Sequence, residues 1–246
     1  MDYMFEQKIT VADSEVNPRN ALKLSALLYY AQETAGGHCQ KMGYDRDSLT
    51  EKNLFWAVLR HRVLIHRLPA AGENIIVRTW PMPATRAAYP RAVRAFDGQG
   101  NVLFELVSLW VLMDRTNRTM VLPGKSGVDV PGILLGDEPA SPGSLAPGVH
   151  QNAAKWQVSQ RDLDINGHVN NTKYLDQVEM LADTLKPADF PKEMTICYLA
   201  ETHAGEELTL QYTLSEDGIF TLDGTRPRPE APEKPERVFA VKLCFA

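Results

Sequence analysis

The two halves of the sequence repeat one another, and this feature constrains the fold more than any other. Residues 13–19 (DSEVNPR) align without gaps on residues 162–168 (DLDINGH). In each half a β-like run precedes this segment and a helical pattern follows it, and an Ala-Gly-Glu turn comes later, at residues 71–73 and 204–206. Similar elements in a fixed order indicate a repeated structural unit. We therefore expect two similar domains, each with one long helix and several strands.

A segment rich in Pro and Gly separates the two halves. Residues 123–148 hold 11 Pro or Gly in 26 positions, a composition that does not support a regular element. A chain of 246 residues is long enough for two domains of ordinary size. We expect an N-terminal domain over residues 1–122, a linker over 123–148 and a C-terminal domain over 149–246.

Hydrophobic periodicity predicts the helices and strands of an α+β fold. Apolar residues at helical spacing mark one long helix in each half: Leu24, Leu27, Leu28, Ala31 and Ala35 in the first, and Leu175, Val178, Ala182 and Leu185 in the second. Runs of β-branched and aromatic residues predict strands over residues 55–66, 74–80, 87–96 and 102–113. Residues 97–101 (DGQGN) predict a hairpin turn between the last two strands. The Pro-rich residues 226–235 predict an exposed loop.

Composition excludes several classes of protein. The net charge of −5 argues against broad binding to nucleic acids, which needs a basic surface. The three cysteines are far apart and form no CxxC pair, which argues against a disulfide framework or a cysteine zinc site. The first residues lack the apolar core of a secretory signal, and the most apolar run, residues 102–113, is too short to cross a bilayer. We expect a cytoplasmic protein.

Asp164, Asn166 and His168 alternate in a polar turn that leads directly into the second predicted helix. If this segment is extended, the three side chains share one face, because strand side chains alternate. Backbone N–H groups at the start of the helix, near residues 168–170, could then polarise a carbonyl oxygen. The alternative is simple helix capping, since Asn and Asp are favoured before a helix.

Residues 162–179 (DLDINGHVNNTKYLDQVE) closely resemble the active-site segment of acyl-acyl-carrier-protein thioesterases, the plant fatty-acid-releasing enzymes and their bacterial relatives. The resemblance covers both halves, including the hairpin that ends in residues 110–114. It implies two tandem hotdog domains, each a long helix wrapped by an antiparallel sheet, packed as an internal pseudo-dimer. It also implies the catalytic residues Asp164, Asn166, His168 and Glu201, and no metal or organic cofactor.

The chain departs from this family at Thr202, where relatives carry a cysteine that was once regarded as the nucleophile. A cysteine mechanism is therefore not expected. Cys197 is nearby in sequence but lies in an apolar run, which is typical of a buried core residue. Read without the family, Glu201 is an exposed charge at the end of a strand.

In the first half, the gapless alignment places Glu15, Asn17 and Arg19 opposite Asp164, Asn166 and His168. This set has no base that titrates near neutral pH. We therefore expect one active site per chain, in the second half. The helix of the first half would be partly core, and the resemblance implies that some of its residues line the acyl pocket.

The resemblance implies hydrolysis of a fatty acyl thioester carried on acyl carrier protein (ACP), with His168 as general base. Asn166 would orient the His168 ring or the substrate, Asp164 would act as an orienting carboxylate or as a nucleophile, and Glu201 would position water. Alternatives are an acyl-CoA thioesterase, a hotdog dehydratase of 3-hydroxyacyl thioesters and a non-catalytic acyl-binding protein. A homodimer is possible.

Because ACP is acidic and the chain is acidic too, docking needs a local basic patch. The candidates are Arg60, Arg62, Arg67, Arg86, Arg91 and Arg94.

Overall fold

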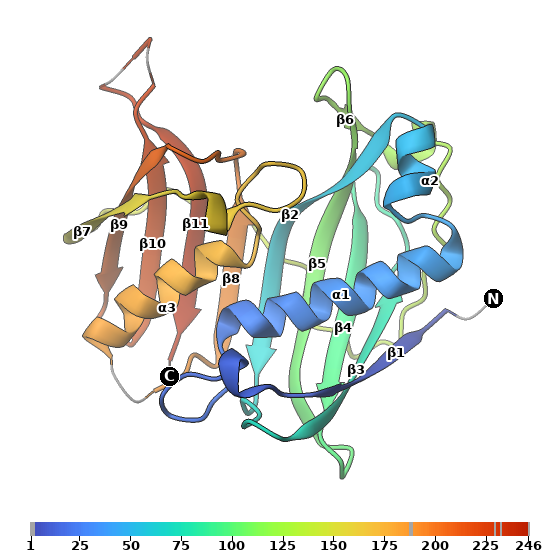
Figure 1. The fold of residues 1–246 in the computed structure, drawn as a ribbon, viewed down its shortest axis with the longest axis horizontal. Helices are drawn as coiled ribbons and strands as arrows, with labels where there is room; N and C mark the ends of the chain where they lie inside the picture. The colour runs from blue at the N-terminus through green and yellow to red at the C-terminus, as the bar shows by residue number, and fades with distance from the viewer. Residues whose placement is uncertain (1–2, 187–188, 229, 232, 246) are drawn as a thin grey trace. The chain divides into compact units, whose positions relative to one another are not determined.

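The computed structural model describes residues 3–186, 189–228, 230–231 and 233–245. The contacts divide the chain into two compact units, shown in Figure 1. Unit 1 comprises Met1–Leu22 and Ala26–Pro142, and unit 2 comprises Lys23–Ser25 and Gly143–Ala246. The domain boundaries at residues 122 and 149 stay predictions. Among the described residues, no helix combines the length and the apolar character that a membrane span needs.

Unit 1 is a curved antiparallel sheet with the long helix α1 (Leu24–Met42) across one face (Figure 1). The sheet has the order β1-β3-β4-β5-β2, and β6 pairs with β5. Its strands are β1 (Phe5–Thr10), β2 (Leu54–Ile65), β3 (Asn74–Pro81), β4 (Tyr89–Phe96), β5 (Val102–Asp114) and β6 (Met120–Val121). The short helices are η1 (Asp13–Glu15), α2 (Arg46–Glu51) and η2 (Pro123–Lys125).

Unit 2 repeats this plan with fewer elements. Its antiparallel strands have the order β8-β11-β10-β9-β7, and α3 (Lys173–Leu185) lies across the sheet (Figure 1). The strands are β7 (Asn152–Gln157), β8 (Glu193–Tyr198), β9 (Glu207–Leu214), β10 (Ile219–Arg226) and β11 (Glu236–Cys244), and η3 spans Gln160–Asp162. The α+β prediction of a helix against an antiparallel sheet in each half is confirmed.

The hydrophobic periodicity located the two helices correctly, because each helix buries one apolar stripe on its own sheet. All five predicted apolar residues of α1 are buried. In α3, three of the four are buried, but Leu185 is 38% exposed and Leu181 takes its place in the core. All four residues lie in the helix as predicted, and Leu185 is exposed because α3 ends at that residue.

The four predicted strands of the first half correspond to β2, β3, β4 and β5. The predicted hairpin turn between β4 and β5 is also confirmed. Asp97 Oδ1 accepts from the N–H groups of Gln99 and Asn101, both at 2.9 Å, and Gly100 supplies the positive φ of 87°.

The Pro- and Gly-rich segment contains no strand, and only η2 is regular in residues 123–148. Much of this segment packs on unit 1, since Val128 and Val130 are buried in a cluster with Leu49 and Tyr89. The Pro-rich residues 226–235 lie partly outside the described residues. Arg226 is the last residue of β10 rather than part of a loop, and its side chain is 22% exposed.

Candidate active site

The polar turn before α3 is closed rather than extended. An isolated β-bridge joins Leu163 to Val169, and the N–H of Asp164 donates to the carbonyl of His168 at 2.8 Å. Gly167 takes a φ of 81°, which favours glycine because it has no Cβ. The segment is therefore not extended, so the condition for placing the three side chains on one face is not met.

The carboxylate of Asp164 stabilises this turn through both of its oxygens. Oδ1 accepts from the backbone N–H of Asn166 at 2.8 Å and from that of His168 at 3.4 Å. Oδ2 accepts from the side-chain amide of Asn166 at 3.2 Å. Asp164 and Asn166 thus contact each other, and the ring of His168 turns to a different partner.

That partner is Glu201, on the loop that follows β8. Its Oε2 lies 3.5 Å from Nε2 of His168, and the two side chains are 46% and 22% exposed. The loop is attached to the turn through the N–H of Val169, which donates to the carbonyl of Thr202 at 2.8 Å. The structure therefore brings two of the four predicted site residues, His168 and Glu201, face to face.

Successive side chains of this loop point alternately toward solvent and toward the core. Glu201 and His203 are exposed, and Thr202 between them is fully buried. The hydroxyl of Tyr174 donates to Thr202 Oγ1 at 3.0 Å, and burial raises the pKa of Tyr174 to about 12. A side chain at position 202 therefore points into the core and not toward His168, which agrees with the expectation of no nucleophile there.

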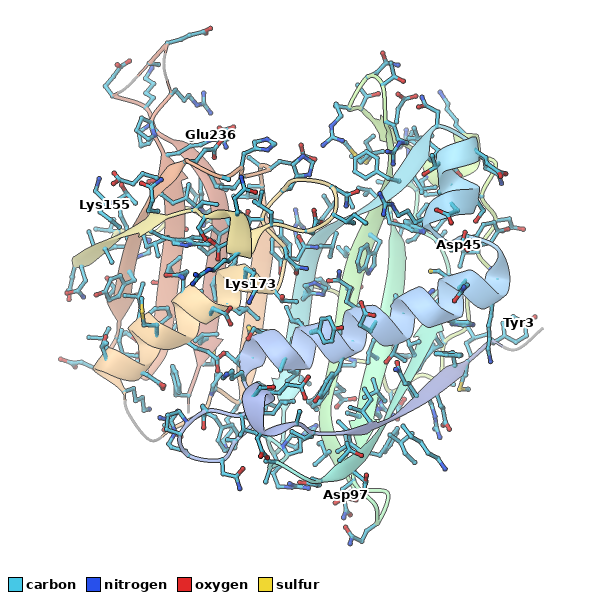
Figure 2. All side chains as sticks on the ribbon, in the orientation of Figure 1. Tyr3, Asp45, Asp97, Lys155, Lys173 and Glu236 are labelled. Atoms are coloured by element: carbon cyan, nitrogen blue, oxygen red, sulfur yellow. The ribbon has the colours of Figure 1, made fainter. Side chains whose placement is uncertain are left out.

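Two residues near the site were missed in the sequence. His203 packs edge-to-face on His168 with 4.8 Å between ring centroids, and its Nδ1 lies 3.3 Å from the carbonyl of Gly167. Arg226 donates to the carbonyl of Glu201 at 2.8 Å and to the carboxylate of Glu236, labelled in Figure 2, at 2.8 Å. The i, i+2 spacing of Glu201 and His203 was the available signal for His203. Because Arg226 was assigned to a Pro-rich loop, its hydrogen bond to the carbonyl of Glu201 was not expected.

The expected oxyanion site at residues 168–170 is not available. The N–H of His168 faces the Asp164 carboxylate, that of Val169 donates to Thr202, and that of Asn170 donates to the carbonyl of Asp162. All three precede α3, which begins at Lys173, labelled in Figure 2. These donors are used to build the turn, so the expectation was wrong.

In the structure, the residues of the two halves correspond with an offset that differs by two residues from that of the gapless alignment. The bridge Val16–Leu22 in unit 1 corresponds to Leu163–Val169 in unit 2. Asn17 accepts from two backbone N–H groups as Asp164 does. The counterparts of Asp164, Asn166 and His168 are therefore Asn17, Arg19 and Ala21, and not Glu15, Asn17 and Arg19.

The corrected register strengthens the contrast between the halves. Ala21 stands where unit 2 has His168, and it carries no titratable group. The N–H of Leu22 donates to the carbonyl of Pro69, as the N–H of Val169 does to that of Thr202, so Leu68 stands where unit 2 has Glu201. Unit 1 therefore has neither the histidine nor the glutamate of this pair.

The predicted basic patch does not form as a whole. Arg91 is only 6% exposed, and its guanidinium donates to Thr79 at 3.2 Å inside unit 1. Arg67 and Arg94 form ion pairs with acidic side chains at 2.6 and 2.8 Å. Arg86 is exposed, and Arg60 and Arg62 are half-buried. The six arginines therefore do not act as one free surface.

Comparison with known proteins gives matches to both halves. The family model of the Acyl-ACP thioesterase N-terminal domain matches residues 2–122, and that of the C-terminal domain matches residues 147–226. A palmitoyl-acyl carrier protein thioesterase of Gossypium hirsutum is 26% identical over 228 residues, covering 85% of this chain and 51% of the relative. A dodecanoyl-[acyl-carrier-protein] hydrolase of Cinnamomum camphora is 26% identical over 214 residues, covering 80% of this chain and 56% of the relative. The chain thus spans about half the length of the curated relatives it matches.

Solved structures share the fold over the full chain. An acyl-ACP thioesterase from Bacteroides thetaiotaomicron superposes with a TM-score of 0.86 at 24% identity, covering 100% of this chain and 98% of the other. The 12:0-ACP thioesterase from Umbellularia californica superposes with a TM-score of 0.80 at 20% identity and the same coverage. The two family models match the two halves in order. The solved thioesterases share the tandem hotdog fold of this chain. The chain belongs to the acyl-ACP thioesterase family.

Proposed function

We propose that this chain hydrolyses fatty acyl thioesters carried on ACP and releases the free fatty acid. The observation that carries the proposal is the approach of His168 Nε2 to Glu201 Oε2, at 3.5 Å on a partly exposed surface of unit 2. An imidazole beside a carboxylate is a suitable general base near neutral pH. The names of the curated relatives, which are ACP thioesterases and hydrolases, support ACP as the carrier.

In the proposed reaction, His168 Nε2 takes a proton from a water whose other hydrogen faces Glu201. The water oxygen attacks the thioester carbonyl carbon, and the C–S bond then breaks. The carrier thiolate leaves and takes the proton from the His168 imidazolium. The products are a fatty acid and a free carrier thiol. Glu201 stabilises the imidazolium while it exists, because opposite charges at this distance attract.

Asn166 and Asp164 have different tasks in this proposal. An amide nitrogen has two N–H donors, and Asn166 uses one of them on Asp164. Its second donor is assigned to the carbonyl oxygen of the substrate. Asp164 is assigned as a positioning residue rather than a nucleophile, because both of its oxygens accept hydrogen bonds within the turn.

Identification of the product tests the proposal. The full chain is incubated with a panel of acyl-ACP substrates and with the matching acyl-CoA compounds, and the products are analysed by mass spectrometry. Free fatty acid released faster from ACP than from CoA supports the proposal. An enoyl thioester would instead identify a dehydratase, binding without turnover would identify an acyl-binding protein, and a preference for CoA would replace the carrier.

Release from ACP would end the elongation of that acyl chain, which places the reaction in fatty acid biosynthesis. The cytoplasmic location and a homodimer both stay predictions. They are tested by fractionation of cells that express the chain and by its molar mass in solution.

A further inference from the structure

His168, Glu201 and His203 form a compact group of metal-ligand side chains. Each offers one ligand atom, and the three atoms lie within 4.8 Å of one another. Among the described residues, no other group of three or more His, Cys, Asp or Glu side chains meets in this way. His203 belongs to this group but has no part in the proposed hydrolysis.

The local backbone explains why the group exists. Glu201 and His203 flank the buried Thr202, so both side chains leave the loop on its exposed side. The hydrogen bond from Val169 to Thr202 holds this loop against the turn that carries His168. Two chain segments far apart in sequence therefore present three ligands to one region of the surface.

One ring nitrogen of His203 faces a backbone carbonyl, as is usual for a metal-binding histidine. Its Nδ1 lies 3.3 Å from the carbonyl of Gly167. A carbonyl oxygen can only accept, so in the neutral ring this contact puts the proton on Nδ1 and the lone pair on Nε2. Histidines that bind metals usually donate their other ring N–H to a carbonyl or carboxylate in this manner.

The donor set suits a divalent transition-metal ion. Two imidazoles and one carboxylate, with a water as fourth ligand, are a known zinc arrangement. Zn–N bonds of about 2.0 Å in a tetrahedral site separate two ligand atoms by about 3.3 Å. His168 Nε2 and Glu201 Oε2 are already 3.5 Å apart, and the exposed His203 needs only a small movement to join them.

We propose that His168, Glu201 and His203 bind a divalent transition-metal ion such as Zn²⁺ reversibly, and that the bound ion blocks hydrolysis. Coordination uses the Nε2 lone pair of His168, which then cannot accept a proton from water. It also occupies the Glu201 carboxylate. Metal binding itself is independent of the catalytic assignment, whereas the inhibition rests on the proposed hydrolysis.

The experiment compares the full chain with a His203→Asn variant by titration calorimetry with ZnCl₂ in the absence of substrate. The shorter amide of His203→Asn can still donate to the Gly167 carbonyl, but it removes the imidazole ligand. His66→Asn is the matched control, because His66 is also half-exposed and also lies beside a carboxylate, Glu105, at 3.2 Å. His66 is not part of the three-residue group.

We expect one Zn²⁺ per chain, and a loss of affinity of at least ~10-fold in His203→Asn, since even partners outside the first ligand shell are worth this much. His66→Asn should bind as the unmodified chain does. Measured against the metal-free rate of each chain, inhibition of acyl-ACP hydrolysis by Zn²⁺ should need a correspondingly higher concentration in His203→Asn. Equal Zn²⁺ affinity with and without His203, or no binding at all, would overturn the proposal.

Failure of the proposed function gives a different result. In that case no fatty acid is released under any condition, while calorimetry still detects the metal and its dependence on His203. If the chain hydrolyses acyl-ACP and Zn²⁺ binds at this group without slowing the reaction, the proposed inhibition is overturned and the proposed metal binding is not.

Discussion

At the scale of single residues, Asp164 illustrates what a sequence pattern reveals and what it hides. The alternation of Asp, Asn and His correctly marked a special turn, but it did not show that Gly167 closes the turn with a positive φ. Closure directs Asp164 back onto its own backbone and leaves the His168 ring to Glu201. Likewise, the sequence placed Thr202 at the cysteine position of the family, but its burial beneath Tyr174 depends on the path of the loop.

This geometry predicts the behaviour of Asp164→Asn. The amide oxygen can still accept the backbone N–H groups, so the turn should persist, while the charge and the hydrogen bond from the Asn166 side chain are lost. We expect kcat for acyl-ACP hydrolysis to fall by less than ~10²-fold, the lower end of what removal of a general base costs. Circular dichroism verifies that the variant is folded. A folded variant with no measurable turnover would contradict this positioning role and favour Asp164 as the nucleophile.

At the scale of helices and strands, periodicity was reliable because amphipathic elements bury one face on a neighbour. The stripe of α1 and the strands β2 to β5 were predicted within one or two residues of their ends. In α3, Leu185 also fits the helical spacing, but as the terminal residue of the helix it is 38% exposed. Contacts between strands also lie outside any local pattern. The register of β2 and β5 pairs His61 with Ser108 in the core, with Nδ1 and Oγ 2.8 Å apart.

The buried His61 predicts a loss of stability in acid. Burial lowers the pKa of His61 from 6.5 to about 3. Between these values the unfolded chain binds a proton that the folded chain does not, so the free energy of unfolding falls as the pH drops below 6.5. From pH 7.5 to pH 5 this one group should contribute a loss on the order of 2 kcal/mol.

A His61→Gln variant isolates this contribution, since glutamine has no charge in this range. Urea denaturation midpoints are measured for both chains from pH 7.5 to pH 5. The variant should lose less stability over the range than the unmodified chain, whatever its stability at pH 7.5. Parallel curves would show that His61 does not control the acid dependence.

At the scale of the whole molecule, the chain contains two copies of one plan that differ in the residues of the turn before the long helix. The repeat was visible in the sequence, but its register was not. The seven matched residues favoured an alignment that is shifted by two residues from the structural correspondence. The β-bridges and turn hydrogen bonds show the true correspondence. By that correspondence Ala21 and Leu68 replace His168 and Glu201 in unit 1. The expectation of a single site in unit 2 therefore rests on better grounds than the alignment that suggested it, and it stays a prediction.

The assignment of His168 as the general base is tested by kcat/KM for acyl-ACP hydrolysis by the unmodified chain, His168→Ala and Arg19→Ala. Arg19 is an exposed residue on the equivalent turn of unit 1, so its removal is the matched control. We predict a fall of ~10²–10⁴-fold for a folded His168→Ala, the usual contribution of a general base, and no change for Arg19→Ala. A folded His168→Ala that keeps more than about a tenth of the normal rate would contradict the assignment of His168 as the base.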